Sequence, residues 1–373
     1  MVDRSIKILF AAGGTGGHLF PALAIADELK KLKPDAGILF VGTKSKIESS
    51  VVPEKGYEFR TIWISGFHRG FRLSNLLFPF KVLVALIQSF FVIRTFRPEI
   101  VIGTGSYVAG PVLWVASLLG IPTVLHESNS YPGVTTRLLA RRASRVFIAF
   151  EMTKKWLQRV DNVELVGNPT RDLLGTVPRE MGTRFFNLNP AKKTLLVFGG
   201  SSGASSLNKA IAGIVNELVD AGIQVIWQVG EKEFEKMTSR QELAVEKVSH
   251  ARSVWVGKFI KEIEYAYAAA DLVMCRSGAT TLAELTRLGK PAILVPYPHA
   301  AANHQGVNAL AMVEHEAAEM VLDRELSTRA KEIIIRLISD DEKLKHMSKQ
   351  SLKLGKPEAG RQVAEKILTM IPR

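Results

Sequence analysis

The residues best suited to chemistry lie in the first glycine-rich segment, Gly13 to His18. It contains four glycines in five residues, so the main chain can turn sharply and approach a ligand closely. An apolar run precedes it and apolar residues at helical spacing follow it, which predicts a strand, a glycine turn and a helix. Main-chain amides at the start of such a helix favour a phosphate or a sugar diphosphate. The segment lacks the lysine of a P-loop and fits the dinucleotide pattern GxGxxG poorly.

His18 directly follows these glycines and is the candidate general base. Imidazole has an ordinary pKa of about 6.5 and can accept a hydroxyl proton near neutral pH. The competing interpretation is that His18 only caps the helix or positions a substrate. His126 and Glu127, at the end of a predicted strand over 122–126, are the alternative catalytic candidates.

Two later segments also have the residue types of a nucleotide-sugar site. A second glycine turn, over 103–111, follows a predicted strand, and ligands collect where parallel strands end. A Ser-Gly turn at 277–278 precedes a predicted helix that contains Glu284, a carboxylate able to accept both hydroxyls of a ribose. Glu284 also suits the early turns of a helix for electrostatic reasons alone. The polar loop over 296–308 carries amide side chains suited to sugar hydroxyls.

The elements that would position these residues alternate as strands and helices along both halves of the chain. The segment KTLLVFGGSSGA at 193–204 repeats the design of residues 7–17 about 190 residues later. We therefore predict an α/β protein with two Rossmann-like domains, whose parallel sheets face each other across a cleft. The predicted domains are 1–167 and 168–356, with a helix over 357–373 packing back on the first. Residues 166–193 show little periodicity and are interpreted as the connection.

Composition limits the class of protein. The 373 residues are 47% hydrophobic and 23% charged, as in folded proteins, and the net charge of +13 favours an anionic partner. The single cysteine, Cys275, excludes intrachain disulfides and a multi-cysteine zinc site, which favours a reducing cytoplasm. The first residues do not have the pattern of a signal peptide, so we expect no export.

The most apolar segment is 73–96. Pro79, Lys81 and Gln88 interrupt it, which argues against a membrane span and leaves a core helix or a helix dipping into a bilayer interface. We expect a helix that is part core and part membrane patch. Basic residues ring the segment, as contact with anionic lipid requires. The expected membrane patch is Arg69, Arg72, Phe78, Phe80, Lys81, Leu83 and Trp114.

Seven motifs together resemble a known family. GGTGGH, GSYVAGP, HESN, VGNPTR, GGSSGA, CRSGATTLAE and HQGVNA occur in the order and approximate spacing of the lipid-linked N-acetylglucosaminyl transferases of peptidoglycan synthesis. The resemblance covers nearly the whole chain. It implies a GT-B fold and inverting transfer of N-acetylglucosamine from UDP-N-acetylglucosamine to the C4 hydroxyl of the muramyl sugar of lipid I. The product would be lipid II, formed at the cytoplasmic face of the membrane by a peripheral enzyme.

The resemblance also implies roles for individual residues. Ile260 would hold the uracil through its main chain, Glu284 the ribose, and Arg171 the diphosphate. Ser106 stands where the family pattern has a second glycine before the tyrosine. The positions matching the acceptor pyrophosphate cradle are Gly13, Gly14, Gly103, Gly105 and Tyr107. The positions matching the donor site are Thr15, Gly16, Gly17, Asn129, Arg171, Ser201, Ile260, Ala279, Thr280, Thr281, Leu282, Ala283, Glu284, Gln305 and Asn308.

The chain contains no Asp-x-Asp sequence, so we expect no required cofactor or metal, with magnesium at most stimulatory. The expected partners are UDP-N-acetylglucosamine, undecaprenyl-linked lipid I, an anionic membrane surface and other cell-wall enzymes. Nucleic acid is not expected as a partner, because the basic residues are dispersed along the sequence and no DNA- or RNA-recognition motif occurs. The alternatives are another GT-B enzyme, such as a diacylglycerol glucosyl transferase or a nucleotide-sugar epimerase, and a non-enzymatic membrane-binding or nucleic-acid-binding module.

Overall fold

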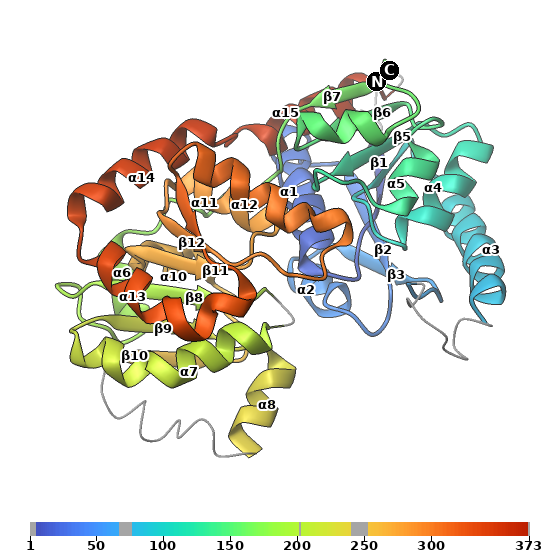
Figure 1. Ribbon diagram of the computed structural model, residues 1–373. Coiled ribbons are helices and arrows are strands. Elements are labelled where there is room, and N and C mark those ends of the chain that lie inside the picture. The colour runs from blue at the N-terminus through green and yellow to red at the C-terminus, as the bar shows by residue number, and fades with distance from the viewer. Residues whose placement is uncertain (1–4, 67–76, 201–202, 240–252, 372–373) are drawn as a thin grey trace. The chain divides into compact units, whose positions relative to one another are not determined.

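The computed structural model describes residues 5–66, 77–200, 203–239 and 253–371 (Figure 1). The chain divides into two compact units. Unit 1 comprises Met1–Arg171 and Lys356–Arg373, and unit 2 comprises Asp172–Gly355. Each unit is built on one parallel sheet with helices in the crossovers, which confirms the predicted α/β fold class with two Rossmann-like sheets.

The sheet of unit 1 has seven parallel strands in the order β3-β2-β1-β4-β5-β6-β7. The central strand β1 pairs with β2 on one side and with β4 on the other, so Leu9 lies opposite Leu39 and Val101. The chain order therefore reverses between β1 and β4. The strands are β1 Lys7–Ala11, β2 Gly37–Gly42, β3 Glu58–Thr61, β4 Ile100–Gly103, β5 Thr123–Glu127, β6 Arg145–Ile148 and β7 Val163–Leu165.

Helices cover both faces of this sheet because β1 is apolar on both sides. Ile8 and Phe10 face one core with α1 (Gly16–Leu32), α2 (Glu48–Glu54) and the C-terminal α15 (Ala359–Thr369). Leu9 and Ala11 face a second core with α3 (Phe78–Phe96), α4 (Ala109–Leu118) and α5 (Val134–Leu139). Helix α15 lies beside α1 although the two are far apart in sequence (Figure 1).

Unit 2 repeats this plan with six parallel strands in the order β10-β9-β8-β11-β12-β13. One face of its sheet packs on α7 (Ser205–Asp220), α13 (Leu326–Ile338) and α14 (Asp341–Leu354), and the other on α10 (Ile263–Ala269), α11 (Ala279–Leu288) and α12 (His304–Glu314). Helix α8 spans Glu231–Ser239. The strands are β8 Thr194–Phe198, β9 Gln224–Gln228, β10 Val254–Gly257, β11 Leu272–Cys275, β12 Ala292–Leu294 and β13 Ala318–Met320.

The segment 166–193, interpreted above as a plain connection, contains helix α6 (Arg179–Phe185). A Cβ atom on Gly182 would lie 2.5 Å from the carbonyl oxygen of Tyr265, so only glycine lets α6 approach α10 this closely. Sequence analysis also missed β7 and β13. Both are three-residue edge strands with polar residues, and only their pairing with β6 and β12 makes them strands.

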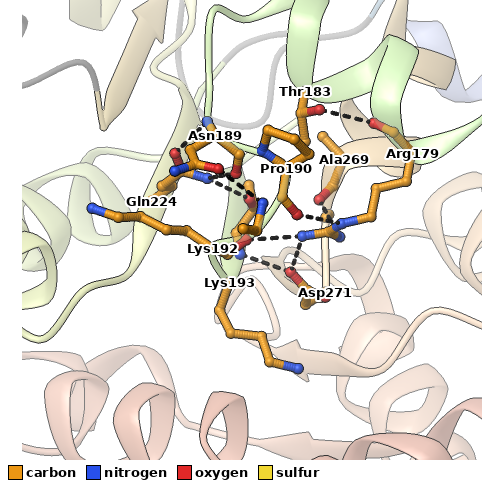
Figure 2. Close-up of polar contacts among 12 residues, drawn as sticks. Arg179, Thr183, Asn189, Pro190, Lys192, Lys193, Gln224, Ala269 and Asp271 are labelled. Atoms are coloured by element: carbon orange, nitrogen blue, oxygen red, sulfur yellow. Dashed lines mark hydrogen bonds and ion pairs between the residues drawn. The ribbon is translucent and has the colours of Figure 1, made fainter.

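A polar network ties α6 to the amino end of the unit 2 sheet (Figure 2). Arg179 donates to Asp271 Oδ2, to the Ala269 carbonyl and to the Lys192 carbonyl, each at 2.9 Å. Asp271 Oδ2 also accepts the main-chain N–H of Thr194 at 2.8 Å. This edge is opposite the strand ends that lead to the predicted donor residues, so the network serves the fold.

Candidate functional site

The two glycine turns of unit 1 meet where its strand order reverses. The first turn follows β1 and the second follows β4, and ligands of open parallel sheets bind beside such a switch point. His18 Nδ1 lies 2.8 Å from the carbonyl oxygen of Thr104, and Thr104 Oγ1 donates to the His18 carbonyl at 2.7 Å. These two bonds hold the start of α1 against the second turn.

The bond to Thr104 determines the tautomer of His18. A carbonyl oxygen only accepts, so Nδ1 of His18 must carry the hydrogen. In the neutral ring Nε2 then has a lone pair. The side chain is partly exposed and follows β1, so His18 is the candidate proton acceptor at the ligand edge of the sheet.

Glu127 is committed to holding the loop that follows β5. Its Oε1 accepts from the main-chain N–H and the side-chain amide of Asn129 at 3.0 and 3.1 Å. Its Oε2 accepts from the Gly133 N–H and the Thr136 hydroxyl at 3.1 and 2.7 Å. A Cβ on Gly105 would lie 3.4 Å from His18 Nδ1 and 3.6 Å from Glu127 Oε2, so Gly105 passes between the two side chains.

His126, the other catalytic candidate, is fully buried. Its Nε2 donates to the Gly167 carbonyl at 3.0 Å, and burial lowers its pKa, so the ring stays neutral inside unit 1. The Nδ1 of His126 has no hydrogen-bond partner among the described residues but is buried. Of the three candidates, only His18 combines a ring nitrogen able to accept a proton with a partly exposed side chain.

Two of the predicted acceptor glycines, Gly13 and Gly14, contact Glu48, a residue that sequence analysis did not single out. The N–H of Gly14 donates to Glu48 Oε2 at 3.0 Å, and Glu48 is fully buried beneath the loop. Tyr107 lies against Gly14, where a Cβ would approach its ring to 3.0 Å, and Gly103 is buried at the end of β4. The only local signal for Glu48 was an acidic residue soon after a buried strand.

In unit 2 the predicted donor residues gather after β11. The turn at Ser277 is fixed from α12, because Ser277 Oγ donates to the Gln305 carbonyl at 2.8 Å and the Asn308 amide donates to the Ser277 carbonyl at 3.1 Å. Asn308 is buried, so it supports the turn from within. Gln305 Oε1 accepts from the Tyr297 N–H at 2.9 Å, and its side chain is half-buried.

Helix α11 begins at Ala279 after this turn and has no side-chain cap. Thr280, Thr281 and Ala283 are half-buried, whereas Ala279 and Leu282 belong to the core. Glu284 is 6% exposed and accepts the hydroxyl of Tyr267 at 2.9 Å, which fixes one carboxylate oxygen.

The remaining donor positions are less closely grouped. The N–H of Ile260 donates to Gln228 Oε1 at 2.9 Å. A contact from the Ile260 main chain to the uracil would therefore use its carbonyl. In unit 1, Thr15 and Gly17 are exposed, Gly16 is buried, and Arg171 stacks on the Phe20 ring at 3.9 Å. Ser201 lies outside the described residues.

Helix α3 has a wide exposed apolar face. Its buried stripe is narrow and consists of Ala85, Ser89 and Ile93, so only part of α3 belongs to the core. By length and composition α3 is the one described helix able to cross a membrane, and 17% of its most apolar window is buried.

Predicted membrane-patch residues take part in contacts between cations and exposed tryptophan rings. Lys81 lies 5.7 Å from the centre of the Trp63 ring, and Arg142 lies 4.4 Å from that of Trp114. Phe80 and Leu83 are more than half exposed, Trp114 is exposed and Phe78 is half-buried, whereas Arg69 and Arg72 lie outside the described residues.

Within the described residues, no group of three or more histidine, cysteine, aspartate or glutamate side chains is placed to hold a metal ion. Cys275 is fully buried at the end of β11, and burial raises the pKa of its thiol, so it acts as a small apolar core residue.

Comparisons with known proteins match the chain over almost its full length. The profile of the Glycosyltransferase family 28 N-terminal domain matches residues 8–148, and that of the C-terminal domain matches residues 194–363. Proteins of Chlorobaculum parvum and Christiangramia forsetii are 43% and 39% identical to the chain, covering 98% and 99% of it and 99% of each relative. Both are named UDP-N-acetylglucosamine–N-acetylmuramyl-(pentapeptide) pyrophosphoryl-undecaprenol N-acetylglucosamine transferase. The crystal structure of MurG from Acinetobacter baumannii is similar, with a TM-score of 0.69 and 25% identity over 98% of this chain and 99% of that one.

Proposed function

The chain belongs to glycosyltransferase family 28, and we infer from this that it transfers N-acetylglucosamine from UDP-N-acetylglucosamine to the N-acetylmuramyl sugar of lipid I, forming lipid II. The near-full-length identity to transferases of that name carries this conclusion. The alternatives of another GT-B lipid glycosyltransferase, an epimerase or a non-enzymatic binder have no comparable support.

The proposed reaction is a single in-line displacement with inversion. The C4 hydroxyl of the muramyl sugar gives its proton to His18 Nε2 while its oxygen bonds to the anomeric carbon of the donor. The bond from that carbon to the UDP oxygen breaks, and UDP leaves with the electron pair. The Thr104 carbonyl supports this role, because it keeps the hydrogen of His18 on Nδ1.

The leaving diphosphate is proposed to be stabilised without a required metal. Main-chain amides at Thr280 and Thr281, in the first turn of α11, and the guanidinium of Arg171 would balance its charge. Glu284, held by Tyr267, would take the ribose hydroxyls. Magnesium would then not be required, although it could stimulate the transfer reaction.

We also propose that α3 holds the enzyme on the cytoplasmic face of an anionic membrane as a peripheral protein. The support is its exposed apolar face, of which Phe80 and Leu83 are part, with Lys81 and Arg142 beside exposed tryptophans. An undecaprenyl-linked acceptor lies in a bilayer, so an enzyme that uses it must reach that surface. Other cell-wall enzymes stay expected partners, and nucleic acid is not expected.

The test is transfer of labelled N-acetylglucosamine from its UDP donor to a soluble analogue of lipid I, in EDTA and then with magnesium. UDP-glucose and UDP-N-acetylgalactosamine serve as competing donors. Metal-independent transfer from the first donor alone is the expected result. A strict magnesium requirement would refute the amide-based diphosphate site, and absence of transfer would refute the assigned activity.

A further inference from the structure

Glu48 is a buried carboxylate that the proposed reaction does not use. It is the first residue of α2 and is fully buried. Its Oε2 accepts the Gly14 N–H at 3.0 Å, and its Oε1 accepts the N–H and the hydroxyl of Thr43 at 3.0 and 2.6 Å. All three partners are donors, so an ionised carboxylate, which only accepts, satisfies each of them. Burying this charge is tolerable only because of these bonds.

Two glycines leave the space that the Glu48 side chain occupies. A Cβ on Gly13 would lie 2.4 Å from Glu48 Oε1, and a Cβ on Gly42 would lie 2.5 Å from Glu48 Cγ. Gly13 follows β1 and Gly42 ends β2, so the neighbouring ends of two paired strands both accommodate this one side chain. At Gly13 the need for glycine is therefore explained by Glu48 as well as by a ligand.

The Tyr107 side chain brings the second loop against the first. A Cβ on Gly14 would approach the Tyr107 ring to 3.0 Å, so the ring lies against the residue whose N–H is bonded to Glu48. Burial raises the pKa of the Tyr107 hydroxyl, and the nearby charge of Glu48 acts in the same direction. The position of the Gly14 main chain therefore limits where the ring can lie.

We propose that Glu48 is a positioning residue of the acceptor site, which sets the shape of the first glycine loop and the orientation of Tyr107. The inference rests on the proposed function. One main-chain donor of the predicted pyrophosphate cradle, the Gly14 N–H, is turned inward to Glu48. Other groups of the cradle must therefore meet the pyrophosphate.

Glu48→Gln tests the hydrogen bond from Gly14 to Glu48 while keeping the shape of the side chain. The side-chain oxygen of the new glutamine can accept both Thr43 donors, which leaves its NH₂ group facing the Gly14 N–H. Two donors then face each other, and the bond to Gly14 is lost. We expect kcat/KM for the soluble lipid I analogue to fall about tenfold or more, chiefly through KM. Amide hydrogen exchange in residues 11–20 should become faster. UDP affinity by calorimetry should stay within about twofold, because a loss confined to the acceptor site leaves the nucleotide contacts intact.

Glu54→Gln is the matched control, since Glu54 is an exposed glutamate at the other end of α2. Thr43→Val removes the hydroxyl that donates to Glu48 Oε1 and should raise the acceptor KM less than Glu48→Gln does, because the bond to Gly14 remains. If Glu48→Gln matches Glu54→Gln in acceptor kinetics and exchange, the inference is wrong. A fall in kcat and in UDP binding stoichiometry with unchanged KM would show a structural role only and would also overturn it. Absence of transfer by the wild type would refute the proposed function, whereas the exchange experiment would still decide whether Glu48 holds the loop.

Discussion

The hydrogen bond from His18 Nδ1 to the Thr104 carbonyl is the residue-scale feature on which the proposed chemistry depends. Removing the imidazole removes the proposed base, so His18→Ala should lower kcat by about 10²- to 10⁴-fold and leave UDP affinity nearly unchanged. Steady-state kinetics and calorimetry measure the two effects. His315→Ala is the control, because His315 Nδ1 also contacts a main-chain carbonyl at 2.8 Å but is exposed at the end of α12. Turnover within a few-fold of wild type in His18→Ala would exclude His18 as the base.

A second residue-scale prediction concerns Tyr267, whose hydroxyl orients the Glu284 carboxylate. Tyr267→Phe removes a hydrogen bond to a charged group and should weaken UDP binding about tenfold. For a UDP analogue lacking the ribose hydroxyls the same substitution should change affinity little. Tyr265→Phe on the same helix is the control. An equal loss for both nucleotides would mean that Tyr267 does not act through the ribose contact.

At the scale of the element, α3 combines a narrow buried stripe with a wide apolar surface. Phe80→Ser with Leu83→Ser should reduce binding to anionic vesicles by about tenfold or more, since each substitution removes a large apolar group from the interface. Activity on a soluble acceptor analogue should be retained. Leu352→Ser, at a leucine 53% exposed against 55% for Leu83, controls for a general loss of apolar surface. Unchanged vesicle binding in the double variant would remove α3 from the membrane contact.

At the scale of the whole molecule, Lys290 links the stability of unit 2 to pH. Its Nζ donates to the Ala270 carbonyl at 2.6 Å, and burial lowers its pKa from 10.5 to about 8, although Asp271 partly opposes this. The unfolded chain keeps the lysine proton to higher pH, so unfolding takes up a proton between the folded and the unfolded pKa of Lys290. The contribution of Lys290 to the free energy of unfolding therefore rises with pH in this interval. From about pH 7.5 to about pH 9.5 this contribution should increase by about 2 kcal/mol.

Lys290→Met should remove this rise, and urea unfolding of both proteins at the two pH values measures it. The buried thiol of Cys275, whose pKa is raised, has the opposite effect but is common to both proteins. Lys353→Met, at an exposed lysine, should leave the rise intact. The same pH dependence in Lys290→Met and wild type would show that Lys290 is not the group responsible.

The sequence by itself determined the class of the fold and the family. Apolar runs such as Ile8 to Ala11, followed by glycine turns, specify buried parallel strands because only a sheet covered on both faces requires them. The short strands β7 and β13 and helix α6 were not predictable, because partners distant in the sequence stabilise them. Periodicity also could not show that α3 leaves most of its apolar face exposed, since a core helix has the same composition.

Sequence motifs likewise placed Glu127 at a strand end and His18 and Glu284 in helices that follow glycine turns, but only the tertiary structure decided what each side chain contacts. The bond to Thr104 fixes the tautomer of His18. Bonds from the loop after β5 occupy the Glu127 carboxylate, and the Tyr267 hydroxyl orients the Glu284 carboxylate. Glu48 shows the same limit, because its importance arises from Gly14, Thr43 and the space left by two glycines. Residue type and spacing set which chemistry is available, whereas the direction of each proton depends on neighbours that only folding brings together.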